Sequence, residues 1–274
     1  METGGRTATI RDLQKKKRRG ARIAALTAYD FRTARLEEAA GVDFILVGDS
    51  IGMAVLGNGT TLGVTMEVML AHCAAVVRGA PSTLVVGDMP FGSYEPSDEL
   101  AVRNAVRFLA EGGVGAVKLE GGNPRSSARV RAIVDSGIPV MGHIGLQPQS
   151  IRKTGGYRVI GADQRERMIS EALALQDAGA FAIVIESMEE DLAGEITGLL
   201  GVPTIGIGAG RRTDGQILVV NDMLGLSGEF SPRFLKRFAE IEPPILEALR
   251  AFVSEVAGGA FPGPEHVHPG KEER

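Results

Sequence analysis

Two short stretches of this chain place an aspartate at the same point of an apolar run. They are FILVGDS at 44–50 and TLVVGDM at 83–89, and in each of them the aspartate, Asp49 or Asp88, follows a glycine. Carboxylate oxygens are the ligands that hard cations such as Mg²⁺ prefer in proteins. We therefore expect Asp49 and Asp88 to be direct ligands of a divalent metal ion, with Glu120 as a third ligand that binds directly or through a water molecule.

Other polar residues also come at or near the end of an apolar run. Lys118 and Glu120 are two apart in AVKLE, so they lie on the same side of an extended strand, and Lys118 is expected to bind a substrate carboxylate or carbonyl oxygen. His143 stands in IPVMGHIG. Glu186 ends FAIVIE, the most hydrophobic run, and a carboxyl in such surroundings keeps its proton to higher pH, which suits a general base.

Each of these acids also has a structural alternative. An aspartate at a strand end, including Asp30 after RIAALTAY, often caps the helix that follows. Glu186 could instead form an ion pair with an arginine. Gathering carboxylates in one place costs on the order of several kcal/mol for each unpaired ion. A cationic partner is therefore expected among them, and Lys118 together with a divalent metal would supply it.

Eight apolar runs, separated by segments with helical periodicity, must position these side chains. The runs are continuous rather than alternating, as in parallel strands that are buried on both faces. Parallel strands of a barrel end at one mouth, so the polar residues would meet there. We predict one (β/α)8 TIM barrel domain over residues 1–274, with an ordered core of about 7–262; an open doubly wound sheet is the alternative. The runs span 22–30, 44–50, 83–89, 116–120, 138–145, 181–187, 203–210 and 216–222.

The two ends of the chain are expected to add helices to the barrel. Residues 7–20 predict a short helix that closes one barrel end, and the basic run 15–19 suits its solvated C-terminus. Residues 231–259 predict two C-terminal helical pieces that Pro243 and Pro244 separate. The tail beyond them is expected to be flexible.

Two helices between the strands have recognisable starts. Ser97 is the predicted N-cap of the first, because Asp98 and Glu99 follow it in the first turn. Asp163, with Glu166 three residues later, predicts the start of the second.

Composition argues against several classes of protein. A net charge of −4 and the absence of tryptophan give no support to a nucleic-acid surface. No apolar run approaches the ~18 residues of a membrane span, and no apolar signal segment stands at the N-terminus, so the cytoplasm is the expected compartment. The single cysteine, Cys73, cannot form an intrachain disulfide.

Several longer motifs together resemble the ketopantoate hydroxymethyltransferase family. The similarity runs from about residue 8 to about residue 268. The motifs are ALTAYD (25–30), VGDSIGMAVLG (47–57), TTLGVTMEVMLAHCAAVVRGAP (60–81), KLEGG (118–122), PVMGHIGLQPQS (139–150), GGYRV (155–159), IGIGAGRRTDGQILVVNDMLGL (205–226) and FPGPEH (261–266).

The resemblance implies a reaction and an assembly. The enzyme would transfer a hydroxymethyl group from 5,10-methylenetetrahydrofolate to 3-methyl-2-oxobutanoate, giving 2-dehydropantoate for pantothenate biosynthesis, through an enolate that Mg²⁺ stabilises. It would be a (β/α)8 barrel and a homodecamer. The segments QPQS and GGYRV look like the family's flexible active-site loop, although Gln147 stands where many members have threonine.

The resemblance also implies roles for single residues. Glu186 would be the proton acceptor. The metal ligands would be Asp49, Asp88 and Glu120. The residues that contact the oxo acid would be Asp49, Ser50, Asp88, Lys118 and His143.

Three other functions stay open from the sequence. A Mg²⁺-dependent enzyme of the phosphoenolpyruvate mutase and isocitrate lyase type would share the barrel and the oxo-acid chelate, but its typical Lys-Lys-Cys-Gly loop is not found in this sequence. IGIGAGRRTDG could cradle a phosphate group after the seventh strand, as in sugar-phosphate barrel enzymes. A non-catalytic barrel is the third alternative, and the number of ionisable groups at strand ends argues against it.

Overall fold

The computed structural model describes residues 9–154, 156, 158–228 and 231–268, which form two compact units. The first unit extends to Val220 and includes Pro232–Leu235. The second unit contains Asn221–Ser231 and the chain from Lys236 onward. Residues 7 and 8 of the predicted N-terminal helix and the last six residues of the predicted flexible tail lie outside the described residues.

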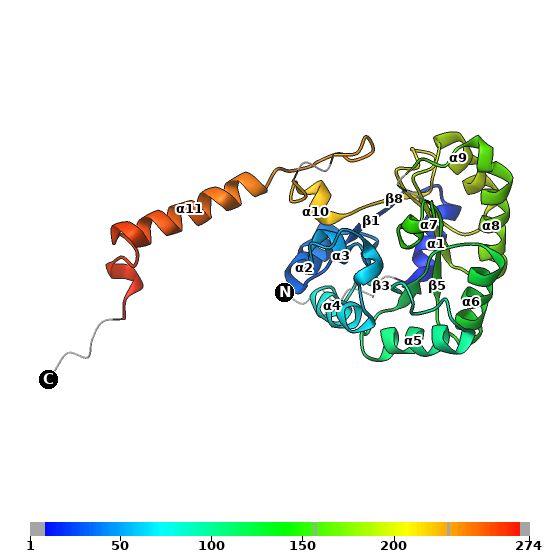
Figure 1. Ribbon diagram of the computed structural model, residues 1–274, viewed down its shortest axis with the longest axis horizontal. Helices are drawn as coiled ribbons and strands as arrows, with labels where there is room; N and C mark the ends of the chain where they lie inside the picture. Colours follow the sequence, from blue (N-terminus) through cyan, green and yellow to red (C-terminus); the bar gives the residue numbers. More distant parts are fainter. Residues whose placement is uncertain (1–8, 155, 157, 229–230, 269–274) are drawn as a thin grey trace. The chain divides into compact units, whose positions relative to one another are not determined.

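The first unit is a closed barrel of eight parallel strands in the order β1 to β8, so the alternative of an open sheet was wrong (Figure 1). Each strand falls within one of the eight predicted apolar runs or, for β8, begins one residue before it. The strands are β1 (Ile23–Thr27), β2 (Phe44–Val47), β3 (Leu84–Asp88), β4 (Ala116–Lys118), β5 (Val140–Gly145), β6 (Ala182–Glu186), β7 (Thr204–Ile207) and β8 (Gly215–Leu218).

Helices connect most of these strands and lie outside them (Figure 1). The α-helices are α1 (Ile10–Arg18), α2 (Phe31–Ala40), α3 (Ile51–Ala54), α4 (Met66–Gly79), α5 (Asp98–Ala110), α6 (Pro124–Asp135), α7 (Ile151–Thr154), α8 (Arg165–Asp177), α9 (Glu190–Leu199), α10 (Val220–Met223) and α11 (Glu242–Gly258). Short 3₁₀ helices are η1 (Thr61–Gly63), η2 (Pro148–Ser150), η3 (Ala162–Gln164) and η4 (Pro264–His266). No described helix is long and apolar enough to cross a membrane.

One of the two predicted helix starts was correct. The Ser97 side chain accepts a hydrogen bond from the amide of Leu100 at 3.1 Å and caps α5 as expected. Asp163 does not cap α8, because residues 162–164 form η3 and the helix begins at Arg165 without a side-chain cap. The 3₁₀ turn supplies the entry that a capping side chain would otherwise provide.

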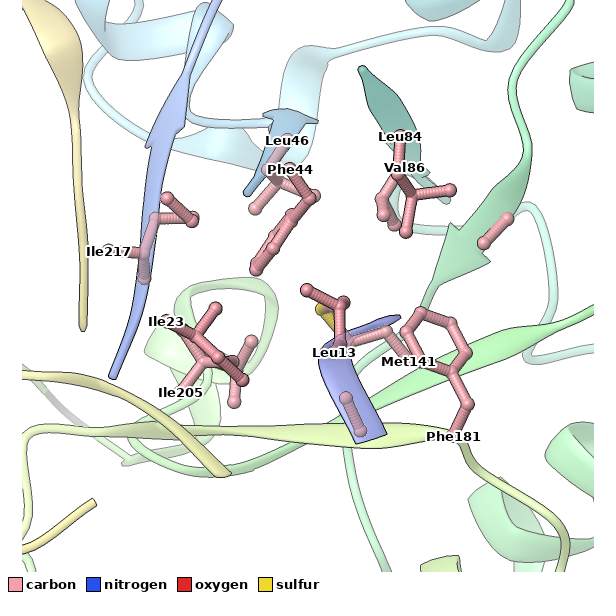
Figure 2. Packing of buried hydrophobic residues seen from close by; sticks show 14 residues of the cluster. Leu13, Ile23, Phe44, Leu46, Leu84, Val86, Met141, Phe181, Ile205 and Ile217 are labelled. Carbon is pink, nitrogen blue, oxygen red and sulfur yellow. The ribbon is translucent and has the colours of Figure 1, made fainter. Parts of the chain in front are cut away.

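The predicted N-terminal helix closes the barrel at the ends where the strands begin. Leu13 of α1 is 2% exposed and belongs to the core cluster, with Phe44 at the start of β2 and Phe181 just before β6. Figure 2 shows Leu13 among side chains that come from strands on different sides of the barrel. This end is therefore filled with apolar side chains, and the chemistry must lie at the other end.

The basic run at the end of α1 is less solvated than expected. Lys16 lies 2.5 Å from a carboxylate oxygen of Asp43, and Lys17 lies 2.8 Å from one of Asp214. Asp43 and Asp214 stand directly before β2 and β8. These lysines therefore tie α1 to the loops that enter the strands.

The second unit differs from the prediction of two helical pieces. Residues 231–241, all of which the structure describes, form no helix, and α11 begins with Pro243 and Pro244 in its first turn. Proline is well accommodated in a first turn, since its missing N–H has no partner there, so these prolines start a helix instead of separating two. Beyond α11, Phe261 packs against Phe252 edge-on and against His266 of η4.

Candidate active site

Polar residues gather at the ends of five neighbouring strands, on the side of the barrel opposite α1. Three strands end on their polar residue, whereas His143 lies two residues before the end of β5. Five of the side chains are nearly inaccessible, with exposed fractions of 1–5%, and only that of Glu186 is partly open, at 20%. The residues are Asp49 after β2, Asp88 ending β3, Lys118 ending β4, Glu120 just beyond it, His143 in β5 and Glu186 ending β6.

Asp88 lies between the two neighbouring strand ends. The backbone amide of Asp49 donates to Asp88 Oδ2 at 3.2 Å, and Lys118 Nζ contacts Asp88 Oδ1 at 2.6 Å. Asp49, Asp88 and Lys118 therefore lie next to one another at the strand ends. Lys118 already has a carboxylate partner within the protein, so it supplies part of the cationic charge that the buried acids need.

The electrostatics show that one lysine is not enough for the buried acids. Burial raises the pKa of Asp49 to about 7, the charge of Asp88 adds to that rise, and Lys118 only partly opposes it. Burial also raises the pKa of Glu120 well above its usual range, against the opposing effect of Lys118. Burial alone would lower the pKa of Lys118, but the charges of Asp88, Glu120 and Asp49 outweigh it and raise that pKa. Fully ionised, the acids would outnumber the single lysine, and the raised pKa values mean that protons take up the difference.

His143 links two of the acids across β5. Its Nδ1 lies 3.7 Å from Glu120 Oε1, and its Nε2 lies 3.4 Å from Glu186 Oε2. Within the described part of the chain, neither ring nitrogen makes a hydrogen bond of normal geometry. Among the ion pairs of the described residues, the partner of Glu186 is thus His143 and not an arginine. His143 therefore lies between the two carboxylates, at 3.7 and 3.4 Å from them.

The backbone around Glu186 is constrained by its neighbours. Gly145 at the end of β5 has φ +97°, and a Cβ there would lie 2.2 Å from the carbonyl oxygen of Glu186. Ser187 has φ +48°, and it is the only non-glycine residue with a positive φ among those described. Such strained backbone is concentrated at functional sites, and here it follows the predicted base directly.

Ser50 lies beside this cluster and bonds to a residue that the sequence did not single out. Its Oγ is 2.8 Å from the Tyr29 hydroxyl, with either group as donor. Asp30, which follows Tyr29, caps a helix, the structural alternative that the sequence left open for each strand-end aspartate. Its carboxylate accepts from the amides of Arg32 and Thr33 and caps α2.

Sequence reasoning missed two buried residues that contact the predicted ligands. Gln149 of η2 donates from Nε2 to Asp49 Oδ2 at 2.8 Å and from its backbone amide to Glu120 Oε2 at 3.1 Å. The Tyr94 hydroxyl donates to Gln149 Oε1 at 2.5 Å. The segment QPQS marked a loop near the site, but nothing in it indicated that Gln149 would reach the carboxylates.

The residues fit a divalent cation in charge and in donor chemistry. Asp49, Asp88 and Glu120 offer only oxygen atoms, and burial together with the charge of Asp88 raises the pKa of Asp49, an effect that a bound cation would oppose. In the present side-chain arrangement, no three His, Cys, Asp or Glu residues of the described chain converge closely enough for one ion. The carboxylates instead contact Lys118 and Gln149.

A cavity of about 510 Å³ lies away from this cluster and does not belong to it. It is lined by residues of the β7–β8 loop, including Gly208 and Gly210, and by Gln216 and Leu218 of β8. Gln216 is exposed whereas Ile217 points into the core, so the cavity lies against the outer face of β8. Of the described site residues at the strand ends, none lines it.

Comparison with known proteins agrees with the resemblance in the motifs. Residues 7–264 match the family model of ketopantoate hydroxymethyltransferase. The 3-methyl-2-oxobutanoate hydroxymethyltransferase of Heliobacterium modesticaldum is 52% identical over 94% of this chain and 94% of its own length. The protein of the same name from Syntrophomonas wolfei is 50% identical over 97% of this chain and 96% of its own length.

Solved structures share the fold at low sequence identity. Phosphonopyruvate hydrolase in complex with oxalate and Mg²⁺ has a TM-score of 0.62 and 14% identity over 96% of this chain and 92% of its own. The 2,3-dimethylmalate lyase of the phosphoenolpyruvate mutase and isocitrate lyase superfamily has a TM-score of 0.59 and 19% identity, covering 96% of this chain and 92% of its own. These two similarities show the barrel alone, whereas the family match covers nearly the whole chain at about half identity. The chain is therefore an enzyme that belongs to the ketopantoate hydroxymethyltransferase family.

Proposed function

We propose that this enzyme transfers the one-carbon unit of 5,10-methylenetetrahydrofolate to 3-methyl-2-oxobutanoate and so forms 2-dehydropantoate, a precursor of pantothenate and coenzyme A. The names of the relatives at about 50% identity support the acceptor and the transferred group. The observation that carries the proposal is the array of His143 between Glu120 and Glu186, beside the Lys118–Asp88 pair, at one mouth of the barrel.

Glu186 is the proposed base that removes the C3 proton of the oxo acid. It is the most accessible acid of the cluster, because its side chain is 20% exposed whereas those of its neighbours are at most 5% exposed. His143 Nε2 lies 3.4 Å from the Glu186 carboxylate, and we propose that the two groups form a hydrogen bond when the substrate is bound. Lys118 and Ser50 are proposed to bind the carboxylate and keto oxygens of the substrate, which offer a second anionic partner to the lysine.

Asp49, Asp88 and Glu120 are the residues that would hold Mg²⁺. When bound, Mg²⁺ would supply a Lewis acid that lowers the energy of the enolate, an effect worth on the order of several kcal/mol. The protein's part is to hold three carboxylates close together, because their mutual repulsion is relieved when a dication binds between them. Burial also excludes water from the carbanionic carbon while it awaits the one-carbon unit.

Product formation with and without EDTA tests the proposed reaction directly. The purified enzyme should form 2-dehydropantoate from the oxo acid and methylenetetrahydrofolate, EDTA should abolish the reaction, and added Mg²⁺ should restore it. Undiminished turnover in EDTA would rule out the metal, and failure to form the product in any condition would rule out the reaction.

Deuterium exchange tests the role of Glu186 apart from the folate. In D₂O the enzyme should exchange the C3 hydrogen of 3-methyl-2-oxobutanoate, and Glu186→Gln should slow that exchange about 100-fold or more, the usual contribution of a general base. Glu190→Gln, a change of the same kind in α9, is the matched control and should exchange at the wild-type rate. Exchange by Glu186→Gln at the wild-type rate would remove Glu186 from this role.

We also propose that the enzyme is a homo-oligomer, with ten subunits as in the family, and that it acts in the cytoplasm. The oligomer is supported by α11, which has no buried residue within the second unit taken by itself, although its Leu249, Phe252, Val253 and Val256 are apolar. A continuous apolar helix face of this kind usually has a protein partner. Light scattering of the purified protein should give the mass of a decamer, near ten times 28.9 kDa, and a monomer mass would refute the assembly.

A further inference from the structure

Gln149 connects strand ends that do not touch each other. It lies in η2, about 100 residues from Asp49 in the sequence, and it is 5% exposed. Its Nε2 donates to Asp49 Oδ2 at 2.8 Å, and its backbone amide donates to Glu120 Oε2 at 3.1 Å. One residue of the β5–α8 connection thus contacts both the acid that follows β2 and the acid that follows β4.

The orientation of the Gln149 amide is fully specified by its partners. Nε2 also donates to the carbonyl oxygen of Met89 at 3.0 Å, so both of its hydrogens are used. Oε1 accepts from the Tyr94 hydroxyl at 2.5 Å, and the same hydroxyl accepts from the amide of Glu120 at 3.3 Å. A flipped amide would place oxygen against both a carboxylate and a carbonyl, so the network selects one orientation.

This arrangement leaves Gln149 without a free donor for a substrate, while each of its side-chain bonds restrains a neighbour. We infer that Gln149 is a positioning residue for the proposed metal site, restraining the carboxylates of Asp49 and Glu120 through its two hydrogen bonds. The inference rests on the proposed function, since it takes these two acids as ligands. Residues that hydrogen-bond to metal ligands in this way typically change metal affinity 10–100-fold when they are replaced.

Titration of the full-length protein with Mn²⁺, followed by the EPR signal of the free ion, tests the inference without requiring turnover. Gln149→Met keeps the length of the side chain and removes its donors, and it should raise the Mn²⁺ dissociation constant about 10-fold or more. Gln176→Met is the matched control, because Gln176 in α8 accepts from the amide of Gly201 at 2.6 Å and lies outside the site. Its dissociation constant should stay within about twofold of wild type, and melting temperatures measured on the same samples report any general loss of stability.

Asp49→Asn separates the two possible failures. If Asp49→Asn binds Mn²⁺ as wild type does, the proposed metal site is wrong and the inference falls with it. If Asp49→Asn weakens binding but Gln149→Met stays within twofold of wild type, only the inference is wrong, and a lower melting temperature would then mark Gln149 as a loop anchor. If Gln149→Met does not fold, Tyr94→Phe is measured instead, because it removes the hydroxyl that donates to Gln149 Oε1. A rise of about threefold in its Mn²⁺ dissociation constant supports the inference. An unchanged dissociation constant overturns it.

Discussion

A buried carboxyl that is not one of the predicted site residues should make the stability of this protein depend on pH. Glu37 of α2 is 4% exposed, and neither of its carboxylate oxygens has a hydrogen-bond partner among the described residues. Burial raises its pKa to about 8, and the charge of Asp30 adds to the rise. The folded state therefore keeps a proton that the unfolded state releases near pH 4.5.

The size of this effect follows from the two pKa values. Between pH 4.5 and pH 8 the folded state binds more protons than the unfolded state, so stability falls as the pH rises. Each unit of pKa difference corresponds to about 1.4 kcal/mol, and integrating between pH 6 and pH 9 gives a loss of about 2.7 kcal/mol from this residue alone. Above about pH 9 the loss levels off, because Glu37 is then ionised in both states.

Urea unfolding followed by circular dichroism at a series of pH values measures this loss. The glutamine of Glu37→Gln cannot ionise, so this variant should not show the loss of stability that Glu37 causes in wild type. Relative to wild type, its free energy of unfolding should therefore increase by about 2–3 kcal/mol between pH 6 and pH 9. Glu111→Gln is a matched control at the exposed end of α5, where the hydrogen bond from Arg107 lowers the glutamate pKa. That control should retain the wild-type slope above pH 6. Parallel pH curves for wild type and Glu37→Gln would refute the reasoning.

Three further substitutions test the packing described above, each by urea unfolding. Gly145→Ala should destabilise the fold by about 3 kcal/mol or more, because the new Cβ would lie 2.2 Å from a backbone oxygen. Gly137→Ala is the control: its φ is +85° but no atom lies within 4 Å of the new Cβ, so it should cost only about 1 kcal/mol. Equal losses of stability in the two variants would contradict this account. Ser187→Val should cost about 1–2 kcal/mol more than Ser187→Gly, because a β-branched residue tolerates φ +48° poorly, and equal stabilities would show that the position is unstrained. Leu13→Ala should cost about 2–5 kcal/mol through the cavity it leaves in the barrel core, and a loss under 1 kcal/mol would mean that α1 does not fill that end.

The order of strands and helices was predictable because it depends on local pattern. The strands of this barrel are covered on both faces, so they read as unbroken apolar runs, and all eight were found. Lys118 and Glu120 could be assigned to one face for a similar reason, since side chains two apart on a strand point the same way. The prolines of α11 show the limit of such rules, because a proline can either end a helix or begin one.

The role of an individual aspartate was not predictable in the same way. Asp30 and Asp49 both follow an apolar strand, and from the sequence either of them could cap the helix that comes next. The structure separates them by where the next helix begins. The α2 helix starts directly after Asp30, so its carboxylate meets free amides, whereas α3 starts two residues after Asp49, whose carboxylate bonds to Gln149 instead.

The amino-acid sequence alone determined the barrel, its polar mouth and the family, because hydrophobic periodicity and short motifs are written in neighbouring residues. Only the tertiary structure decided which side chains share protons and hydrogen bonds. The pairing of Lys118 with Asp88 and the reach of Gln149 to Asp49 join residues 30 and 100 positions apart. Such contacts depend on the lengths of loops and on the closure of the ring of strands, and no local pattern encodes either of them.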